Sequence, residues 1–341
     1  MTSPTRVVAF GGGHGLASIL RGLRLLRDPL HLDITAVVTV GDNGGSSGRL
    51  RAERGGLPPG DLRQALAALV DPEDEIGVAA ADMLQYRFGG AAPLAGHAMG
   101  NLLLCGLIEH YGDPVAALDL AATLMRAGGR VLPMSRTPVD IEATVRGADP
   151  GRPADVLAVR GQHAVAVTPG EVLSLRLAPQ RPEACAEAVA AVHAADWLLF
   201  GPGSWYTSVI PHLLVPKLAD AILSSPARRL VTLNLVAEGE TSGLSLPDHL
   251  RALGRYLPGL RADVVLADVN AIGDPAGLRA AAESLGARVV SAAVAVTDGA
   301  PRHDPDALAQ ALRAVLATHP AAAGAATVQD QGPIGQKAPA R

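Results

Sequence analysis

Glycine, serine and charged residues are concentrated in residues 41–49 (GDNGGSSGR), directly after an apolar run at 34–40. Glycine lets backbone N–H groups face a ligand without a Cβ in the way, and serine hydroxyls add hydrogen-bond donors. An arginine at the end of the segment adds a fixed positive charge suited to phosphate. We therefore expect an anion-binding loop at the end of a strand. Its expected ligand contacts are Asp42, Asn43, Gly44, Gly45, Ser46, Ser47 and Arg49.

Two further glycine-rich segments, residues 11–15 (GGGHG) and 201–208 (GPGSWYTS), each follow a short apolar run. A glycine turn between a strand and a helix places a diphosphate at the helix N-terminus. Either segment alone could be a plain turn that eases strand-to-helix packing. Together they favour a ligand lying across the strand ends at a topological switch point. The expected contacts are Gly11, Gly12, Gly13, His14, Gly15, Gly201, Gly203, Ser204, Thr207 and Asn234, which ends a later strand.

Asp61, His97 and Asn101 lie where helices are expected to begin, in the segments PPGDLR and GHAMGN. Asp61 could cap its helix, or it could face Asp42 as a metal ligand or general base, and the sequence leaves both open. Capping explains only one of His97 and Asn101, so the pair favours site lining, with His97 as a donor to phosphate or a proton carrier. Asp42, Asp61 and His97 are thus catalytic candidates, none of them firm, and Asp42 and Asp61 are the metal candidates.

Alternating strand and helix patterns surround these segments. Strand, glycine turn, helix and strand within residues 6–40 form a βαβ unit. The helix expected at 98–111 is apolar nearly all round and should be buried. Around 129–180 short β-like runs, including 165–167, alternate with Gly/Pro turns and predict a β-rich insertion. Residues 319–341 lack periodicity and predict a disordered tail after one α/β domain at 1–318.

The composition narrows the class of protein. Of the 341 residues 48% are hydrophobic, which is enough for a sizeable core, and the net charge of −4 argues against nucleic-acid binding. No run reaches the ~18 apolar residues of a membrane span, so membrane insertion is not expected. Met1–Thr5 shows no signal-peptide pattern. Cys105 and Cys185 fit small buried hydrophobes in a reducing compartment, and we expect a cytoplasmic protein.

Several of these segments together resemble the YvcK/CofD-like family, specifically its YvcK branch of gluconeogenesis factors. The matching stretches are 10–15, 41–50, 58–63, 86–88, 96–101, 201–215 and 302–304, in the family's order. The resemblance implies a Rossmann-like three-layer α/β/α fold with a mainly parallel sheet. CofD-branch relatives are transferases that join phospholactate to a deazaflavin with a guanosine-diphosphate-activated donor and a divalent metal. YvcK-branch relatives look like cytoplasmic binders of UDP-sugars, notably UDP-N-acetylglucosamine, needed for cell shape and growth on gluconeogenic carbon.

The resemblance also suggests roles for particular residues. It implies that residues 11–15 and 41–49 hold the diphosphate, that Ser204, Tyr206 and Thr207 line the nucleotide cleft, and that Arg302 reaches in from the C-terminal side. This chain departs from the family pattern at Asn43, where a second aspartate is usual, and one carboxylate fewer weakens a hard-metal site. It also departs at Glu238, which replaces Gln-Pro, and at Gly41, which replaces an alanine.

Three functions follow as alternatives. The first is a nucleotide-sugar-binding regulator with a UDP-sugar ligand and no turnover, acting through an unidentified regulatory protein and with homo-oligomers left open. The second is a Mg²⁺-dependent transferase with a nucleotide-diphosphate donor, in which Asp42 and Asp61 hold the metal. Magnesium is the one cofactor considered, and none is certain. The third is an NAD(P)-dependent oxidoreductase, against which Ser18 stands at the position of the third glycine.

Overall fold

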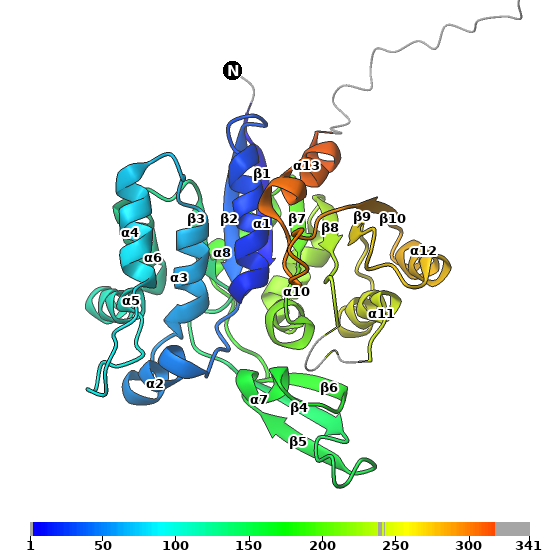
Figure 1. Cartoon of the computed structure of the whole chain (residues 1–341), viewed down its shortest axis with the longest axis horizontal. Coiled ribbons are helices and arrows are strands. Elements are labelled where there is room, and N and C mark those ends of the chain that lie inside the picture. The colour runs from blue at the N-terminus through cyan, green and yellow to red at the C-terminus, as the bar shows by residue number, and fades with distance from the viewer. Residues whose placement is uncertain (1–2, 238–240, 242, 318–341) are drawn as a thin grey trace, which may run out of the picture.

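A seven-stranded parallel sheet in the order β10-β9-β8-β7-β1-β2-β3 forms the centre of the computed structural model (Figure 1), which describes residues 3–237, 241 and 243–317. Its central strands are buried on both faces, as expected when helices cover both sides of a parallel sheet. The strands are β1 (Thr5–Gly11), β2 (Leu32–Val38), β3 (Arg130–Pro133), β7 (Trp197–Phe200), β8 (Arg228–Thr232), β9 (Val264–Asp268) and β10 (Arg288–Ala292).

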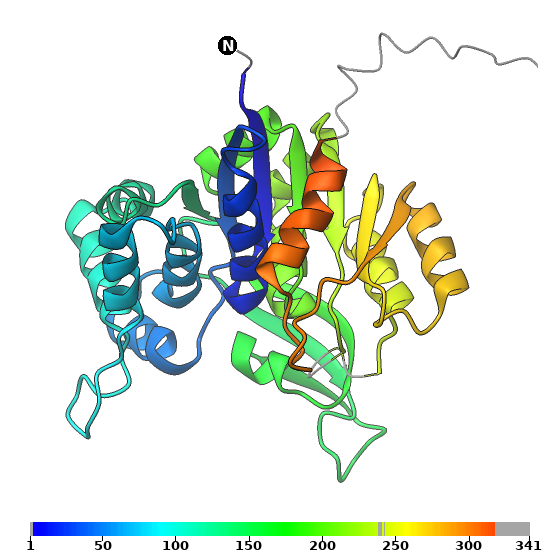
Figure 2. The same ribbon diagram turned by 45° about the horizontal axis from the view of Figure 1, so that its top comes forward.

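Helices cover both faces of this sheet. On one face α1 packs against α3 and α13, and on the other α8 and α10 pack together (Figures 1 and 2). Helix α1 buries Leu16, Leu20 and Leu23, a spacing that places them on a single helical face. The Rossmann-like three-layer α/β/α fold is thereby confirmed. The bounds are α1 (Gly13–Leu26), α3 (Pro59–Ala68), α8 (Ala186–Ala194), α10 (Pro216–Ser224), α11 (Leu246–Tyr256), α12 (Pro275–Ser284) and α13 (Pro305–Leu316), with a short π-helix (Trp205–Val209) and α9 (Ile210–Leu213) after β7.

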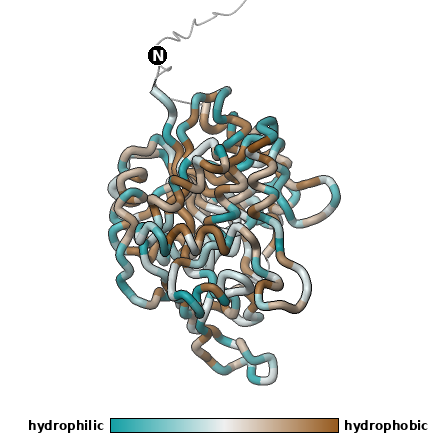
Figure 3. The backbone as a smooth tube through the Cα atoms, turned by 90° about the vertical axis from the view of Figure 1, so that its left-hand side faces the viewer, coloured by the Kyte–Doolittle hydropathy of each residue, from teal (hydrophilic) through white to brown (hydrophobic). Residues whose placement is uncertain are grey.

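Four of the five helices between β2 and β3 form a flank of the molecule, α2 (Gly45–Arg54), α4 (Glu75–Gln85), α5 (Met99–Tyr111) and α6 (Pro114–Leu124). The expectation that α5 is buried is wrong, because Gly100, Asn101 and Leu104 are its only buried residues and Leu103 is 37% exposed. Helices α3, α4 and α6 contact α5 but leave its outer face open. Figure 3 views this flank, where hydrophobic and hydrophilic stretches alternate along the helices. This open face does not by itself indicate a second copy of the chain, and homo-oligomer formation stays a prediction.

Residues 140–178 form a separate antiparallel sheet in the order β5-β4-β6, with β4 (Asp140–Arg146), β5 (Val156–Arg160) and β6 (Glu171–Ala178). The expected β-rich range of 129–180 contains this sheet but also β3, which belongs to the large sheet. The β-like run at 165–167 was wrongly assigned, because it begins inside helix α7 (Gln162–Ala166). Gly161, at φ +97°, turns the chain out of β5, and its carbonyl accepts the Val165 N–H at 3.0 Å.

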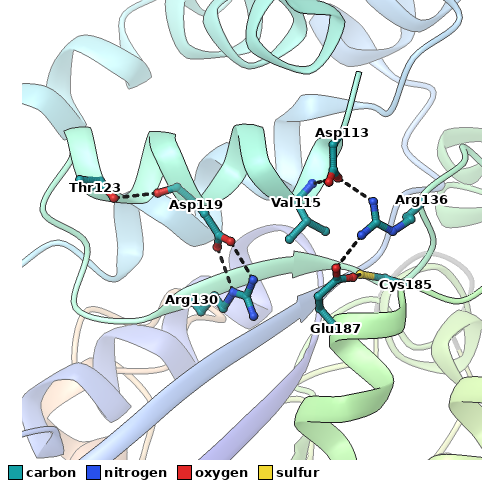
Figure 4. Close-up of polar contacts among 8 residues, drawn as sticks. All are labelled: Asp113, Val115, Asp119, Thr123, Arg130, Arg136, Cys185 and Glu187. Atoms are coloured by element: carbon teal, nitrogen blue, oxygen red, sulfur yellow. Dashed lines mark hydrogen bonds and ion pairs between the residues drawn. The ribbon is translucent and has the colours of Figure 1, made fainter. Parts of the chain in front are cut away.

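Ion pairs anchor the root of this insertion (Figure 4). Arg136, between β3 and β4, donates to Asp113 at the start of α6 and to Glu187 in α8, each at 2.6 Å. Arg130 in β3 binds both carboxylate oxygens of Asp119 in α6, at 2.9 and 2.7 Å. Bidentate pairs of this kind fix orientation as well as distance. The insertion therefore begins from a position held on two sides.

The sheet changes direction of growth between β1 and β7. Strands β2 and β3 are added on one side of β1, and β7 to β10 on the other, so the loops after β1 and β7 diverge at a topological switch point. Phe10 stacks on Phe200 at 4.9 Å directly beneath these loops. The loops touch above the stacked rings, because a Cβ on Gly15 would lie 2.2 Å from the Pro202 carbonyl oxygen. No side chain fits at position 15.

We expect Gly15→Ala to destabilise the fold by about 2–3 kcal/mol, because neither backbone at this contact is free to withdraw. Urea denaturation of the variant measures the change. The control is Gly106→Ala on α5, where a Cβ meets nothing within 4 Å and helix propensity should raise stability by about 0.5–1 kcal/mol. Equal stability of Gly15→Ala and the unmodified protein would contradict the described contact.

Candidate functional site

The two loops at the switch point are held together by backbone and side-chain contacts. Gly11 ends β1, Gly12 precedes α1, and Gly13, His14 and Gly15 form its first turn. Asn234, just beyond β8, accepts the Gly203 N–H at 2.8 Å and donates to the Gly203 carbonyl at 2.9 Å. Gly201 and Gly203 have φ of +68° and +140°, which glycine adopts readily. The N-terminus of the 14-residue helix α1 thus opens beside a pinned second loop.

The hydroxyl residues of the 201–208 loop turn inward. Ser204 Oγ and Thr207 Oγ1 hydrogen-bond each other, and Thr207 is buried. Tyr206 is also buried, with its ring edge-on to Tyr256 at 6.2 Å. Contact of a ligand with Tyr206 stays a prediction, and it requires a path to a side chain that now packs in the core. The backbone of Pro202 and Gly203 and the Ser208 hydroxyl are the parts of this loop that lie against residues 11–15.

The 41–49 loop folds back on itself and onto the start of α3. Asp42 Oδ1 accepts the Gly44 N–H at 2.8 Å, and Ser47 Oγ accepts the Gly60 N–H at 3.0 Å. Gly60 has no room for a side chain, since a Cβ there would lie 2.4 Å from Ser47 Oγ and 3.1 Å from Asp42 Oδ2. The structure therefore brings 41–49 and 58–63 together, as the sequence analysis supposed for Asp42 and Asp61.

Asp61 does not cap α3, whose N-cap is Pro58, but faces the first glycine loop. A Cβ on Gly12 would lie 2.6 Å from Asp61 Oδ2 and 2.5 Å from Thr39 Cγ2. Asp61 is 7% exposed, and its Oδ2 has no hydrogen-bond partner among residues 3–237, 241 and 243–317. Burial, followed by the charge of Asp42, raises the pKa of Asp61 to about 7, against the Gly13 amide and Arg63, which lower it.

Oxygen atoms dominate this corner of the site. Thr39, the residue after β2, brings its Cγ2 methyl beside Gly12, and its buried hydroxyl has no partner within the described parts of the chain. Mg²⁺ commonly binds one or two carboxylates and completes its shell with phosphate and water. The set fits a hard cation that arrives with a phosphate ligand. No group of three His, Cys, Asp or Glu side chains that could hold a metal without such help occurs in the described residues.

Asn43 points away from this corner, toward the insertion. Its Oδ1 accepts the His163 N–H at 3.0 Å, in the first turn of α7. A Cβ on Gly161 would lie 2.1 Å from Asn43 Nδ2, so the contact is close. An aspartate oxygen could accept the same hydrogen bond. This contact between the 41–49 loop and α7 was not predicted, because nothing in the sequence relates residue 43 to residue 163.

His97 and Asn101 hold Ser46 in place. Asn101 Nδ2 donates to Ser46 Oγ at 3.0 Å, and Ser46 Oγ lies 3.0 Å from His97 Nδ1. Because the hydroxyl already accepts from Asn101, it is free to donate to His97. Burial and then the charge of Arg49 lower the pKa of His97, which favours the neutral ring that this arrangement needs. The observed geometry makes His97 an acceptor toward Ser46.

Arg302 lies on an exposed segment beyond β10. It pairs with Asp298 at 2.6 Å, and a bridge joins Ala295 to His303. Asp268, at the end of β9, anchors the segment by accepting the Ala295 N–H at 3.0 Å. In Figure 2 this orange segment descends from α13 toward the carboxyl end of the sheet. Glu238, the departure from the family pattern in the neighbouring loop, and the tail at 319–341 lie outside the described residues, as does residue 318.

The fold and these loops define a Rossmann-like α/β protein with glycine-rich loops at its topological switch point. Residues 7–297 match the family described as 2-phospho-L-lactate transferase CofD, and the chain belongs to the CofD family. It is 48% identical over 315 residues to the "Putative gluconeogenesis factor" of Mycobacterium tuberculosis H37Rv, covering 91% of this chain and 90% of that protein. It is 34% identical over 275 residues to the "Gluconeogenesis factor" of Bacillus subtilis, covering 80% and 82%.

Solved structures agree with this assignment. The crystal structure of a member of the UPF0052 family from Bacillus halodurans has a TM-score of 0.79 and 31% sequence identity, and covers 91% of this chain and 99% of that one. None of the described helices is long and apolar enough to span a membrane.

The raised pKa of Asp61 predicts a pH-dependent stability. The pKa of Asp61 is about 7 in the folded protein and about 4 in the unfolded chain. The contribution of this carboxyl to the free energy of unfolding is therefore fully present below about pH 4 and is lost as the pH rises toward 7. Asp61→Asn lacks this titration, so we expect the variant to gain on the order of 3 kcal/mol over the unmodified protein between pH 4 and pH 8.

Urea denaturation at pH 4.5, 6 and 8 measures this difference, and NMR titration of the Asp61 carboxyl carbon checks the pKa directly. A stability difference that stays constant across these pH values would show that Asp61 is ionised throughout, and hence solvated or paired.

Proposed function

We propose that this protein binds a nucleotide sugar of the UDP-N-acetylglucosamine type at the β1–β7 switch point and acts as a regulatory gluconeogenesis factor. The carrying observation is the contact of the two glycine loops, where Gly15 leaves no space beside the Pro202 carbonyl. Backbone meets backbone there, which fits a surface of peptide groups presented to a diphosphate. Relatives at 48% and 34% identity bear the name gluconeogenesis factor, which supports the role.

The electrostatics of the site support an anionic ligand. Helices α1 and α2 both begin at this edge, at Gly13 and Gly45, and their N-terminal amides carry partial positive charge. Neither helix has an acidic residue in its own first turn or a hydrogen bond from its N-cap side chain, and the carboxylates of Asp61 and Asp42 take one amide each, those of Gly13 and Gly44. Two uncapped helix starts beside glycine turns suit the two phosphates of a sugar nucleotide.

A Mg²⁺-dependent transferase is the second candidate, favoured by one observation, the unpartnered buried oxygen of Asp61 beside Asp42. Asp42 and Asp61 would hold the metal, which would stabilise negative charge on a diphosphate leaving group. The turn of Asn43 toward the insertion leaves two carboxylates at the corner. That donor set is also sufficient to hold a metal–nucleotide complex without reaction.

A charge placed on the 41–49 loop tests the binding proposal. Gly45 and Gly55 stand at opposite ends of α2, both with positive φ, at +47° and +73°, and both with nothing within 4 Å of a Cβ. Aspartate tolerates this conformation. Gly45→Asp brings a carboxylate to the proposed diphosphate, and we expect UDP-N-acetylglucosamine affinity to fall at least tenfold by calorimetry.

Gly55→Asp, with the same charge and the same backbone strain, should leave that affinity within twofold of the unmodified protein. Equal effects of the two substitutions would move the diphosphate away from the start of α2. Absence of binding to the unmodified protein at near-millimolar ligand would end the proposal itself.

Nucleotide release distinguishes the two candidates. The unmodified protein is incubated with Mg²⁺ and UDP- or GDP-activated donors, together with a panel of hydroxyl acceptors, and free nucleotide is measured by chromatography. For a regulator we expect no release above the buffer rate. Release that is abolished in Asp61→Asn would establish the transferase.

A further inference from the structure

Three arginines near the start of α5 have no acidic partner. Arg49, Arg63 and Arg87 take part in none of the ion pairs found within residues 3–237, 241 and 243–317. Arg54, five residues after Arg49, shows the contrast by lying 2.6 Å from Glu109. The three come from α2, α3 and the segment after α4, so their proximity is a product of the fold.

Their guanidinium groups gather around residues 95–101. Arg49 donates to the Ala95 carbonyl at 2.8 Å, and Arg87 donates to the next carbonyl, that of Gly96, at 3.0 Å. Arg63 donates to Asn101 Oδ1 at 2.8 Å and also to Gln85. Gly96, at φ +76°, permits this approach, since a Cβ there would lie 3.3 Å from Arg49 Nη2.

The positive charges of the three guanidinium groups repel one another. The oxygen atoms that accept their hydrogen bonds are neutral carbonyl and amide oxygens, which offset this repulsion only in part. Arg63 is 3% exposed, so its charge is poorly solvated. Burial, and then the positive charge of Arg87, lower the pKa of Arg63 to about 10, while Asp61 offsets part of the effect. Arg49 and Arg87 are exposed and keep donors available. An anion bound between them would remove the repulsion.

This cluster adjoins the proposed diphosphate loop. Arg49 lies one turn after Ser46 on α2, and Ser46 is bonded to His97 and Asn101. Asn101 in turn accepts from Arg63. Hydrogen bonds therefore connect the proposed diphosphate loop to Arg63, and Arg49 continues from the same loop along α2.

We propose that Arg49, Arg63 and Arg87 form a second anion site, which receives a carboxylate or phosphate on the sugar of the bound nucleotide. This inference rests on the proposed function and adds a preference to it: the diphosphate site accepts a neutral sugar such as N-acetylglucosamine, and a sugar that also carries an acidic group binds more tightly. Arg49 and Arg87 contact the anion. Arg63, which is buried, attracts the anion through its positive charge and holds Asn101 by a hydrogen bond. Fork-shaped guanidinium groups suit a planar carboxylate or a phosphate.

A matched pair of ligands tests the ligand class. UDP-glucuronate and UDP-glucose differ by one carboxylate at the sugar C6. By calorimetry we expect the unmodified protein to bind UDP-glucuronate at least tenfold more tightly. Arg87→Gln and Arg49→Gln should each reduce that preference to threefold or less, with Arg87→Gln leaving UDP-glucose affinity within twofold. Arg54→Gln removes an equal charge from α2 and should retain the full preference.

Inorganic phosphate tests the site without a nucleotide. Thermal unfolding of the ligand-free protein should show a saturable rise in Tm with added phosphate, lost in Arg87→Gln and kept in Arg54→Gln. If neither sugar nucleotide binds, the proposed function fails, and this phosphate response alone then supports or overturns the second site. Equal affinity for the two sugar nucleotides overturns the acidic-sugar inference while the nucleotide-binding proposal stands. A phosphate response that is unchanged in Arg87→Gln overturns the second site.

Discussion

The close approach of two backbones at the switch point is the constraint on which the rest of this site depends. A Cβ on Gly15 would lie 2.2 Å from the Pro202 carbonyl and 2.6 Å from Gly203 Cα, so the loops after β1 and β7 form one continuous surface of peptide groups. Strand order places them there, the Phe10–Phe200 stack supports them, and Asn234 fixes Gly203 from the far side. Peptide groups held this rigidly offer a ligand a fixed surface without the entropy cost of ordering side chains.

Burial of a carboxyl beside that surface adds the second constraint. Thr39 and Asp61 leave no room for a side chain at position 12, yet Asp61 Oδ2 and Thr39 Oγ1 have no hydrogen-bond partner among the described residues. An unsatisfied buried polar atom costs stability unless a ligand or ion satisfies it. Beside the proposed anion-binding loop, either a proton on Asp61 or a bound cation would satisfy this oxygen, and both place positive charge at the same point. The raised pKa of Asp61 means that, without a ligand or cation, this carboxyl binds a proton more readily than an exposed aspartate does.

The sequence predicts well what parallel strands impose and poorly what tertiary contacts decide. Glycine and serine after apolar runs predicted the loops at 11–15, 41–49 and 201–208, because parallel strands deliver their carboxyl ends to one edge. The apolar pattern of α5 predicted burial, but pattern alone does not say whether a neighbour covers a face, and Leu103 is exposed. Asn43 contacts His163, which lies 120 residues away in the sequence. Arg63 and Arg87 come close to each other only because α3, α4 and α5 pack together. No local signal encodes these contacts.

The two walls of the site differ in charge, and this difference argues for a ligand with direction. At the switch point the donors are backbone amides and hydroxyls, with no arginine among the loop residues 11–15 and 201–208. On the α5 side three guanidinium groups lack carboxylates, and Arg51 joins α2 to the insertion through Asp140 at 2.7 Å. Asn43 makes a second link from the same loop to α7. The insertion therefore contacts and supports the side of the site that carries the arginines, while the sheet supports the side formed by the loops 11–15 and 201–208. A sugar nucleotide whose diphosphate lies on the peptide amides and whose acidic sugar group reaches the guanidinium groups matches both walls in one orientation only.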